Sequence, residues 1–163
     1  MHRKFTGYYP GALGRITEVH AVYYHGNWGF DASFEIQVGR ELAGFLEGFR
    51  ASRDGLWLCL VDGSFAGSIA AEGGQPGKSA RLRWFIVAPA HQGSGIGREL
   101  LQRAVSFCRD RGYDPVFLWT FRGLEAAGHL YESTGFVLQE EHPVDRWGAR
   151  IREQRYQLSP AVR

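Results

Sequence analysis

Apolar residues recur every three or four positions in the first third of the chain, which is the spacing of amphipathic helices. The first helix is expected at about residues 13–25, before Gly26-Asn27-Trp28-Gly29 breaks it. The second is expected to begin after Asp31, a residue type suited to a helix N-cap. The inward positions are Ile16, Val19, His20, Tyr23 and Tyr24 in the first helix, and Phe34, Val38, Leu42, Phe45 and Phe49 in the second.

From residue 55 onward, short apolar runs between turn residues predict strands. The runs cover residues 56–61, 65–71, 80–87, 116–121, 136–140 and 151–158. Asp62-Gly63-Ser64 is a hairpin signal, and a glycine-rich loop follows at 73–77. Two more helices are expected at about 97–111 and 124–133, ended by Gly112 and Gly135. This order predicts an α/β domain whose mixed sheet is covered by helices on both faces.

Composition narrows the class of protein. The 163 residues are the length of one domain, 1–163, and 44% hydrophobic content can form its core. A net charge of +2 is too small for a binder of nucleic acid. Cys59 and Cys108 lie in apolar patterns and give neither a disulfide framework nor a metal site. No apolar segment suits a leader or a membrane span, so we expect a cytoplasmic protein without membrane contact.

The segment 92–97 is the most informative one for chemistry. A strand ends there, and three glycines at alternate positions then open a helix. Such a loop points backbone N–H groups at an anion, and the helix dipole adds to the attraction, so a phosphate or pyrophosphate is the expected ligand. The dinucleotide fingerprint fails because Arg98 stands at the third glycine, and no lysine completes a Walker A loop. A connector without a ligand remains the alternative.

These residues resemble a known family. Gln92-Gly93-Ser94-Gly95-Ile96-Gly97 resembles the Q/R-x-x-G-x-G/A signature of the GNAT superfamily of acyl-CoA-dependent N-acyltransferases, and the segment 127–136 is similar to its A…LYE..GF segment. The likeness covers essentially the whole chain and is most specific over 80–137. The segments 23–30, 82–87 and 118–121 resemble a subgroup often fused to MarR-type DNA-binding domains, for which the N-terminal portion is too short.

The resemblance implies a mixed, mostly antiparallel central sheet, acetyl-CoA as the acyl donor and no metal. It implies that Tyr131 protonates the departing thiolate while an amine attacks the thioester directly, without an acyl-enzyme. An amphipathic core tyrosine is the alternative for Tyr131. The residues implied to bind the donor, by the strand backbone, the loop amides or a phosphate contact, are Phe85, Ile86, Val87, Gln92, Gly93, Ser94, Gly95, Ile96, Gly97 and Arg98.

The chain departs from the family's pattern at one position of the strand before the loop. Many members carry a glutamate there as general base, whereas this chain has Arg81, with Arg83 two residues on and facing the same way. Arginine cannot accept a proton near neutral pH. Other candidates for the base are Glu35, Glu72, His20, His25 and Glu153. Glu35 is preferred because it lies near the expected acceptor site, although it also fits a solvated helix carboxylate.

The two arginines predict an acceptor with a carboxylate or phosphate, unless they pair with neighbouring acids. Trp28 is a candidate wall of the acceptor pocket. The expected partner is a small-molecule or peptide amine, and a homodimer is left open. A non-catalytic domain that senses acyl-CoA is the second functional hypothesis, because the strand carboxylate is missing.

Overall fold

The computed structural model describes residues 2–75, 77–158 and 160. The helices are α1 (Ala12–Trp28), α2 (Ala32–Glu47), α3 (Ile96–Asp110) and α4 (Glu125–Ser133), with a 3₁₀ turn at Pro89–His91. The strands are β1 (Arg3–Thr6), β2 (Gly55–Val61), β3 (Ser64–Gly73), β4 (Ala80–Val87), β5 (Val116–Phe121), β6 (Phe136–Arg146) and β7 (Ala149–Leu158).

The strands form one seven-stranded sheet in the order β1-β2-β3-β4-β5-β7-β6. Only β4 and β5 pair in parallel, and every other neighbouring pair in the described part of the chain is antiparallel. The last strand, β7, lies between β5 and β6. The expected mixed, mostly antiparallel sheet is therefore confirmed.

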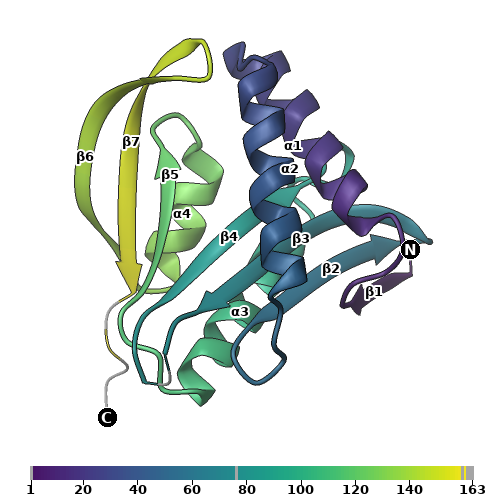
Figure 1. Cartoon of the computed structure of the whole chain (residues 1–163), viewed down its shortest axis with the longest axis vertical. Helices are drawn as coiled ribbons and strands as arrows, with labels where there is room; N and C mark the ends of the chain where they lie inside the picture. The colour runs from purple at the N-terminus through teal and green to yellow at the C-terminus, as the bar shows by residue number, and fades with distance from the viewer. Residues whose placement is uncertain (1, 76, 159, 161–163) are drawn as a thin grey trace.

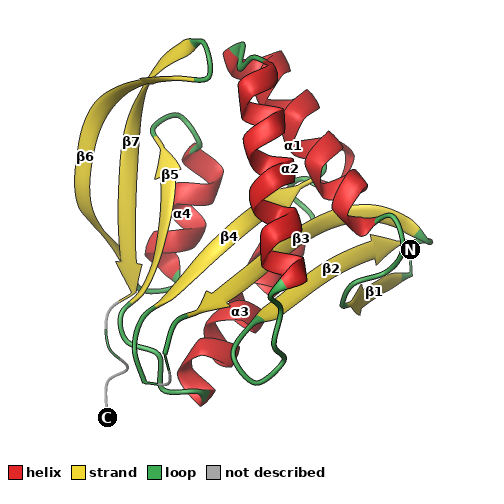
Figure 2. Cartoon of the chain, viewed as in Figure 1, coloured by secondary structure: helices red, strands yellow, loops and turns green. Residues whose placement is uncertain are grey.

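Helices cover both faces of the sheet, each over its own apolar core (Figures 1 and 2). The helices α1 and α2 pack on one face, where Ile16, Leu42 and Phe30 are buried. The helices α3 and α4 pack on the other face, around residues such as Leu100 and Tyr131. A strand in a sheet with both faces covered is buried at successive positions, as β3 is from Phe65 to Ala71, where Ser68 is the polar member.

The ends of the helices follow local chemistry, with one correction. The Asp31 side chain accepts a 3.0 Å hydrogen bond from the Ser33 amide and caps α2 as expected. The expected break at residues 26–29 is wrong, because α1 continues through Gly26 to Trp28. Gly29 ends it with a left-handed φ of 73° and an N–H bonded to the His25 carbonyl. Trp28 thus lies in the last helical turn rather than in a loop.

Two features of the strands were not predicted from the sequence pattern. The strand β1 is four residues long and pairs with β2, with Phe5 opposite Cys59. The strand β6 extends to Arg146, well beyond residue 140, because it pairs with β7 through Pro143 up to a tight turn at Trp147-Gly148. Its polar side chains hide the strand from a search for apolar runs, as expected for a strand at the edge of a sheet.

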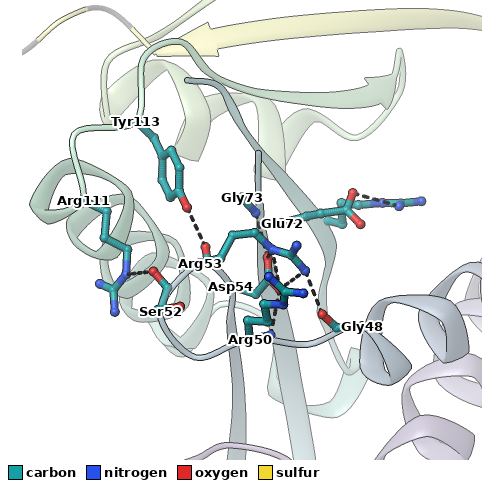
Figure 3. Close-up of polar contacts among 10 residues, drawn as sticks. Gly48, Arg50, Ser52, Arg53, Asp54, Glu72, Gly73, Arg111 and Tyr113 are labelled. Carbon is teal, nitrogen blue, oxygen red and sulfur yellow. Dashed lines mark hydrogen bonds and ion pairs between the residues drawn. The ribbon is translucent and has the colours of Figure 1, made fainter. Parts of the chain in front are cut away.

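A buried carboxylate fixes the connection from α2 to β2 (Figure 3). The Asp54 side chain has no exposed surface and accepts hydrogen bonds from the amides of Arg50 and Gly73 and from the Arg53 guanidinium. Burial by itself raises the pKa of Asp54, but these hydrogen bonds outweigh it and hold the pKa below its ordinary value. The Tyr113 hydroxyl donates to the Arg53 carbonyl and ties the turn to the end of α3.

Candidate active site

A cleft opens where β4 and β5 part. The two strands pair only from Ala80 to Leu82 against Val116 to Leu118, and Figure 1 shows them running apart beyond that point. From Arg83 to Val87, no β5 residue in the described chain pairs with β4. The N–H and C=O groups on this side of β4 are therefore available to a ligand that lies along the strand.

A β-bulge turns the strand within this open segment. Ser68 pairs with Ile86 and Ala70 with Arg83, so that Trp84 and Phe85 together oppose one residue of β3. Trp84 has a left-handed φ of 49°, and its carbonyl accepts a 2.8 Å hydrogen bond from the Ser68 hydroxyl. The bulge directs Trp84 into the core under α2 and Phe85 toward Tyr131 on the other face.

The glycine-rich loop leads directly into the start of α3. Gly93 and Gly95 have φ values of 78° and 86°, which a residue with a Cβ adopts only under strain. Gly95 is the N-cap residue, and no described side chain caps the helix. The first amides of α3 are thus left for an anion. A Cβ on Gly97 would lie 3.1 Å from the Leu130 side chain, so this glycine permits close packing of α3 on α4.

Arg3 of β1 contacts this loop and the first turn of α3. The sequence pattern did not indicate this role for Arg3. Its guanidinium donates a 2.8 Å hydrogen bond to the Ser94 carbonyl and forms an ion pair with Glu99 in the first turn of α3. The Ser94 hydroxyl bonds in turn to the His91 carbonyl. Both oxygens of Ser94 are therefore engaged in contacts within the protein.

The cleft has a volume of about 980 Å³ and brings together most of the residues expected from the sequence. The expected residues that line it are Trp28, Arg81, Arg83, Phe85, Ile86, Val87, Gln92, Gly93, Gly95, Gly97, Arg98 and Tyr131. Two expected donor-binding residues do not line it. Ile96 has its side chain in the core, and Ser94 is held by the contacts described above.

Tyr131 lies on the second turn of α4 with its ring among other aromatic rings. The ring centroids of Phe85 and Tyr156 are 5.9 and 5.4 Å away. Only 5% of the residue is exposed, and burial raises the pKa of the Tyr131 phenol well above its ordinary value. Tyr131 borders the cleft, and its phenol stays protonated throughout the neutral range.

The two arginines of β4 have different surroundings. Arg83 forms ion pairs with Glu41 of α2 and, at 3.3 Å, with Glu72 of β3. Its guanidinium also lies 4.2 Å from the centroid of the Trp84 ring. For Arg81, by contrast, the buried Nε has no hydrogen-bond partner among the described residues. Of the two interpretations offered for these arginines, pairing with neighbouring acids therefore applies to Arg83.

Glu41 was missed by the sequence analysis although a signal was present. It lies between Val38 and Leu42 on the stripe of α2 that packs against the sheet. A carboxylate at such a position needs a partner, and Arg83 provides it. Burial alone would raise the pKa of Glu41. The hydrogen bonds from Arg83 and Gln37 outweigh this effect, so that the pKa of Glu41 is below its ordinary value.

The structure places the five candidate bases differently. Glu35 is exposed on α2 and does not line the cleft, Glu72 is paired with Arg83, and the His25 Nδ1 lies 2.9 Å from the Phe30 carbonyl. His20 and Glu153 do line the cleft. The structure therefore does not bring the preferred candidate, Glu35, together with the other expected residues, because its position on α2 points to solvent.

His20 and Glu153 differ in their surroundings. Burial lowers the pKa of His20 to about 4, so that the imidazole is neutral at pH 7. Its Nδ1 lies 2.8 Å from the Ile16 carbonyl and must donate there, which leaves Nε2 as an acceptor. The Glu153 carboxylate accepts a 2.7 Å hydrogen bond from Arg146.

The hairpin of β6 and β7 lines the side of the cleft where the acceptor is expected to bind, here called the acceptor side. The amide of Asp31 donates a 2.9 Å hydrogen bond to the Trp147 carbonyl, and the Trp147 indole donates to the Gln37 side chain at 2.9 Å. Trp147 also packs on Phe34, with 4.9 Å between ring centroids. Trp28 adds a further aromatic wall, 5.2 Å from the Phe121 ring.

These features define an α/β protein with a cleft suited to an extended anionic ligand. A model of the acetyltransferase (GNAT) family matches residues 15–136. The chain belongs to this family. In the described residues no cluster of side chains suits a metal ion, and no helix is long and apolar enough to cross a membrane.

The chain is also similar in sequence to individual acetyltransferases. The chain is 35% identical to a streptothricin acetyltransferase from Streptomyces lavendulae over 77 residues, which are 47% of this chain and 41% of that protein. It spans less than half the length of the curated relatives it matches.

Solved structures share the fold. An acetyltransferase of the GNAT family from Staphylococcus aureus superposes with a TM-score of 0.74 at 16% identity, over 97% of this chain and all of the other. A Salmonella typhimurium protein solved with its cofactor acetyl-CoA gives a TM-score of 0.68 at 19% identity, over 100% of this chain and 98% of the other.

Proposed function

We propose that this protein transfers the acetyl group of acetyl-CoA to a primary amine. The observation that carries the proposal is the continuity of two features, the open edge of β4 from Arg83 to Val87 and the uncapped start of α3. An arm that lies along the strand ends with its phosphates at the helix start. The acetyl-CoA complex of the Salmonella protein, which shares the fold, supports the same donor.

The residues of the cleft fit this donor. The backbone of Phe85, Ile86 and Val87 would pair with the pantetheine amides, as an added strand does. The amides of the loop 92–97 would hold the pyrophosphate, because they lie at the positive end of the α3 dipole without a side-chain cap. Arg98 lines the cleft in the first turn of α3 and adds a positive charge there.

Acetyl-CoA supplies an activated thioester, and the chain supplies orientation and protons. In the balanced reaction, the amine nitrogen forms a bond to the acyl carbon, the carbon–sulfur bond breaks and one amine proton goes to solvent. The Tyr131 hydroxyl donates a proton to the thiolate and regains it from water. A backbone N–H on the open segment of β4 would polarise the thioester carbonyl.

Two of the candidate bases, His20 and Glu153, are among the described residues that line the cleft, and neither stands free in the place of the family's strand glutamate. His20 has its pKa lowered to about 4, and the Glu153 carboxylate is held by a hydrogen bond from Arg146. We therefore assign the loss of the ammonium proton to solvent, before the amine attacks.

A non-catalytic domain that senses acyl-CoA is the second candidate function. The observation that favours it is the arginine at position 81, where many family members carry the base. The likeness to the subgroup fused to MarR-type regulators, a homodimer and a cytoplasmic location stay predictions. The acceptor is expected to be a small-molecule or peptide amine, as the relatives' names, which include an L-amino acid N-acyltransferase, also suggest.

The experiment that tests the proposal measures thermal unfolding with and without acetyl-CoA, with NAD and ATP as controls. A ligand at 100 times its Kd stabilises the native state by about 2.7 kcal/mol, which is about 5–10 °C here. A shift of the unfolding midpoint with acetyl-CoA but not with NAD or ATP supports acetyl-CoA as the donor. No shift with acetyl-CoA contradicts the proposal. Release of CoA that depends on an added amine separates the enzyme from the sensor.

A further inference from the structure

Of the two arginines of β4, one has no ion-pair partner among the described residues. Arg81 lies on β4 opposite Phe117, within the three-residue stretch where β4 and β5 still pair. It therefore sits at the narrow end of the cleft. Its Nε is fully buried, yet no described residue accepts a hydrogen bond from it. A buried donor without an acceptor is costly, so such a group often marks a place for a ligand.

The other charged groups on the acceptor side are already paired. Glu41 is bound to Arg83, which also contacts Glu72, and Glu153 is bound to Arg146. Arg81 is the remaining charged side chain among the described lining residues from α2, β4, β6 and β7. Burial and the neighbouring Arg83 lower the pKa of Arg81 more than the carboxylates of Glu41, Glu72 and Glu153 raise it, which agrees with incomplete compensation of its charge. An anion beside it would complete the compensation.

We infer that the acceptor is a small amine that carries one carboxylate, and that Arg81 binds this carboxylate at the narrow end of the cleft. The inference rests on the proposed function and names its substrate class. A guanidinium recognises the oxygens of a carboxylate or a phosphate. A carboxylate fits better, because one unpaired guanidinium matches one negative charge. A small acceptor is inferred because the cleft, about 980 Å³ in volume, must hold the arm of the donor as well.

The test first compares matched acceptors on the wild-type protein. Amino acids are paired with their own carboxamides, and phosphoethanolamine is paired with ethanolamine, while CoA release is measured. The kcat/KM of at least one amino acid is expected to exceed that of its amide by at least tenfold. Equal rates with acids and amides overturn the inference. So does activity with the phosphate but with no amino acid, because the bound group is then not a carboxylate.

Variants then test the residue. Arg81→Gln is expected to raise the KM for the amino acid at least tenfold, to leave the KM for its amide within twofold and to keep the Kd of acetyl-CoA. Arg81→Lys is expected to be intermediate, and Arg40→Gln, at an exposed position of α2, is the control. An equal rise of KM for acid and amide would mean that Arg81 is structural.

A binding measurement covers the case of an inactive variant. With CoA bound, the amino acid is expected to raise the unfolding midpoint of the wild type but not that of Arg81→Gln; equal shifts overturn the inference. If Arg81→Gln does not fold, the acid and amide pairs on the wild type decide. If acetyl-CoA does not bind, or no amine of any charge releases CoA, the proposed function fails. If only amines without an acidic group are acetylated, the proposed function stands, and the inference that the acceptor carries a carboxylate is contradicted.

Discussion

The guanidinium of Arg3 donates a 2.8 Å hydrogen bond to the carbonyl oxygen of Ser94, 91 residues further along the chain. Removing it frees the glycine-rich loop that is proposed to bind the pyrophosphate. Arg3→Ala is expected to weaken acetyl-CoA binding about fivefold, since one such bond contributes about 1 kcal/mol. Isothermal titration calorimetry measures the Kd. Arg15→Ala, which breaks an exposed ion pair on α1, is the control and should leave the Kd unchanged.

Tyr131→Phe is expected to lower kcat by about 100-fold or more, the contribution of a positioned general acid. The Kd of acetyl-CoA should change little, because the ring and its packing remain. Tyr156→Phe is a matched control, since Tyr156 packs on Tyr131 at 5.4 Å but does not line the cleft. Steady-state kinetics of CoA release measures both. Equal losses in the two variants would show that Tyr131 acts through packing.

The dependence of rate on pH is expected to follow the acceptor. The pKa of His20 is lowered to about 4, and that of Tyr131 is raised above the neutral range, so neither titrates between pH 6 and 9. The kcat/KM should rise about tenfold per pH unit until the amine itself is deprotonated. Two acceptors whose amines differ in pKa should give curves displaced by that difference. A common inflection for both would reveal a titrating group of the enzyme.

Asp54 is expected to make folding sensitive to acid. Its folded-state pKa is depressed below 3.8, so its contribution to stability is present above the unfolded pKa. That contribution is lost as the pH falls through the folded pKa. Asp54→Asn should cost about 2–3 kcal/mol at pH 7, or about 5–10 °C in Tm. It should also flatten the dependence of Tm on pH below about 4.

Calorimetric scans from pH 3 to 7 measure this effect. Asp110→Asn, at an exposed position on α3, is the control. The assignment is contradicted if Asp54→Asn and Asp110→Asn show the same Tm at each pH.

Two glycine substitutions should act in opposite directions. A Cβ on Gly73 would lie 2.3 Å from both the Arg53 carbonyl oxygen and the Tyr113 hydroxyl, so Gly73→Ala should destabilise by about 1–3 kcal/mol. A Cβ on Gly14, inside α1, meets no described atom within 4 Å. Gly14→Ala should therefore stabilise the protein by up to about 1 kcal/mol. Chemical denaturation gives both values, and a change of the same sign in both would contradict the argument.

The sequence was sufficient for features that depend on local chemistry. Apolar periodicity located the four helices and most strands, and the Asp31 cap and Gly112 follow from the preferences of single residues. The glycine-rich segment could be placed at a strand-to-helix turn because its spacing is itself the signal.

Features that depend on pairing between distant residues were not predictable. The end of α1 was misjudged because Gly26 carries a small penalty that packing overrides. The strand β1 is too short to show a pattern, and its Arg3 acquires a role only when it docks beside β2. Likewise, Arg81 and Arg83 are indistinguishable in sequence, and the position of Glu41 on α2 separates them.

Where β4 and β5 part, each strand has an unpaired inner edge, so the sheet has two edges in addition to those at β1 and β6; the third edge, on β4, runs from Arg83 to Val87. Unpaired strand edges are templates on which other chains add strands and aggregate, and proteins generally cover or blunt them. Here the exposed backbone of the third edge lies inside a cleft, where a coenzyme arm fits lengthwise. A bound donor would therefore act as a protective cap on this edge as well as a reactant.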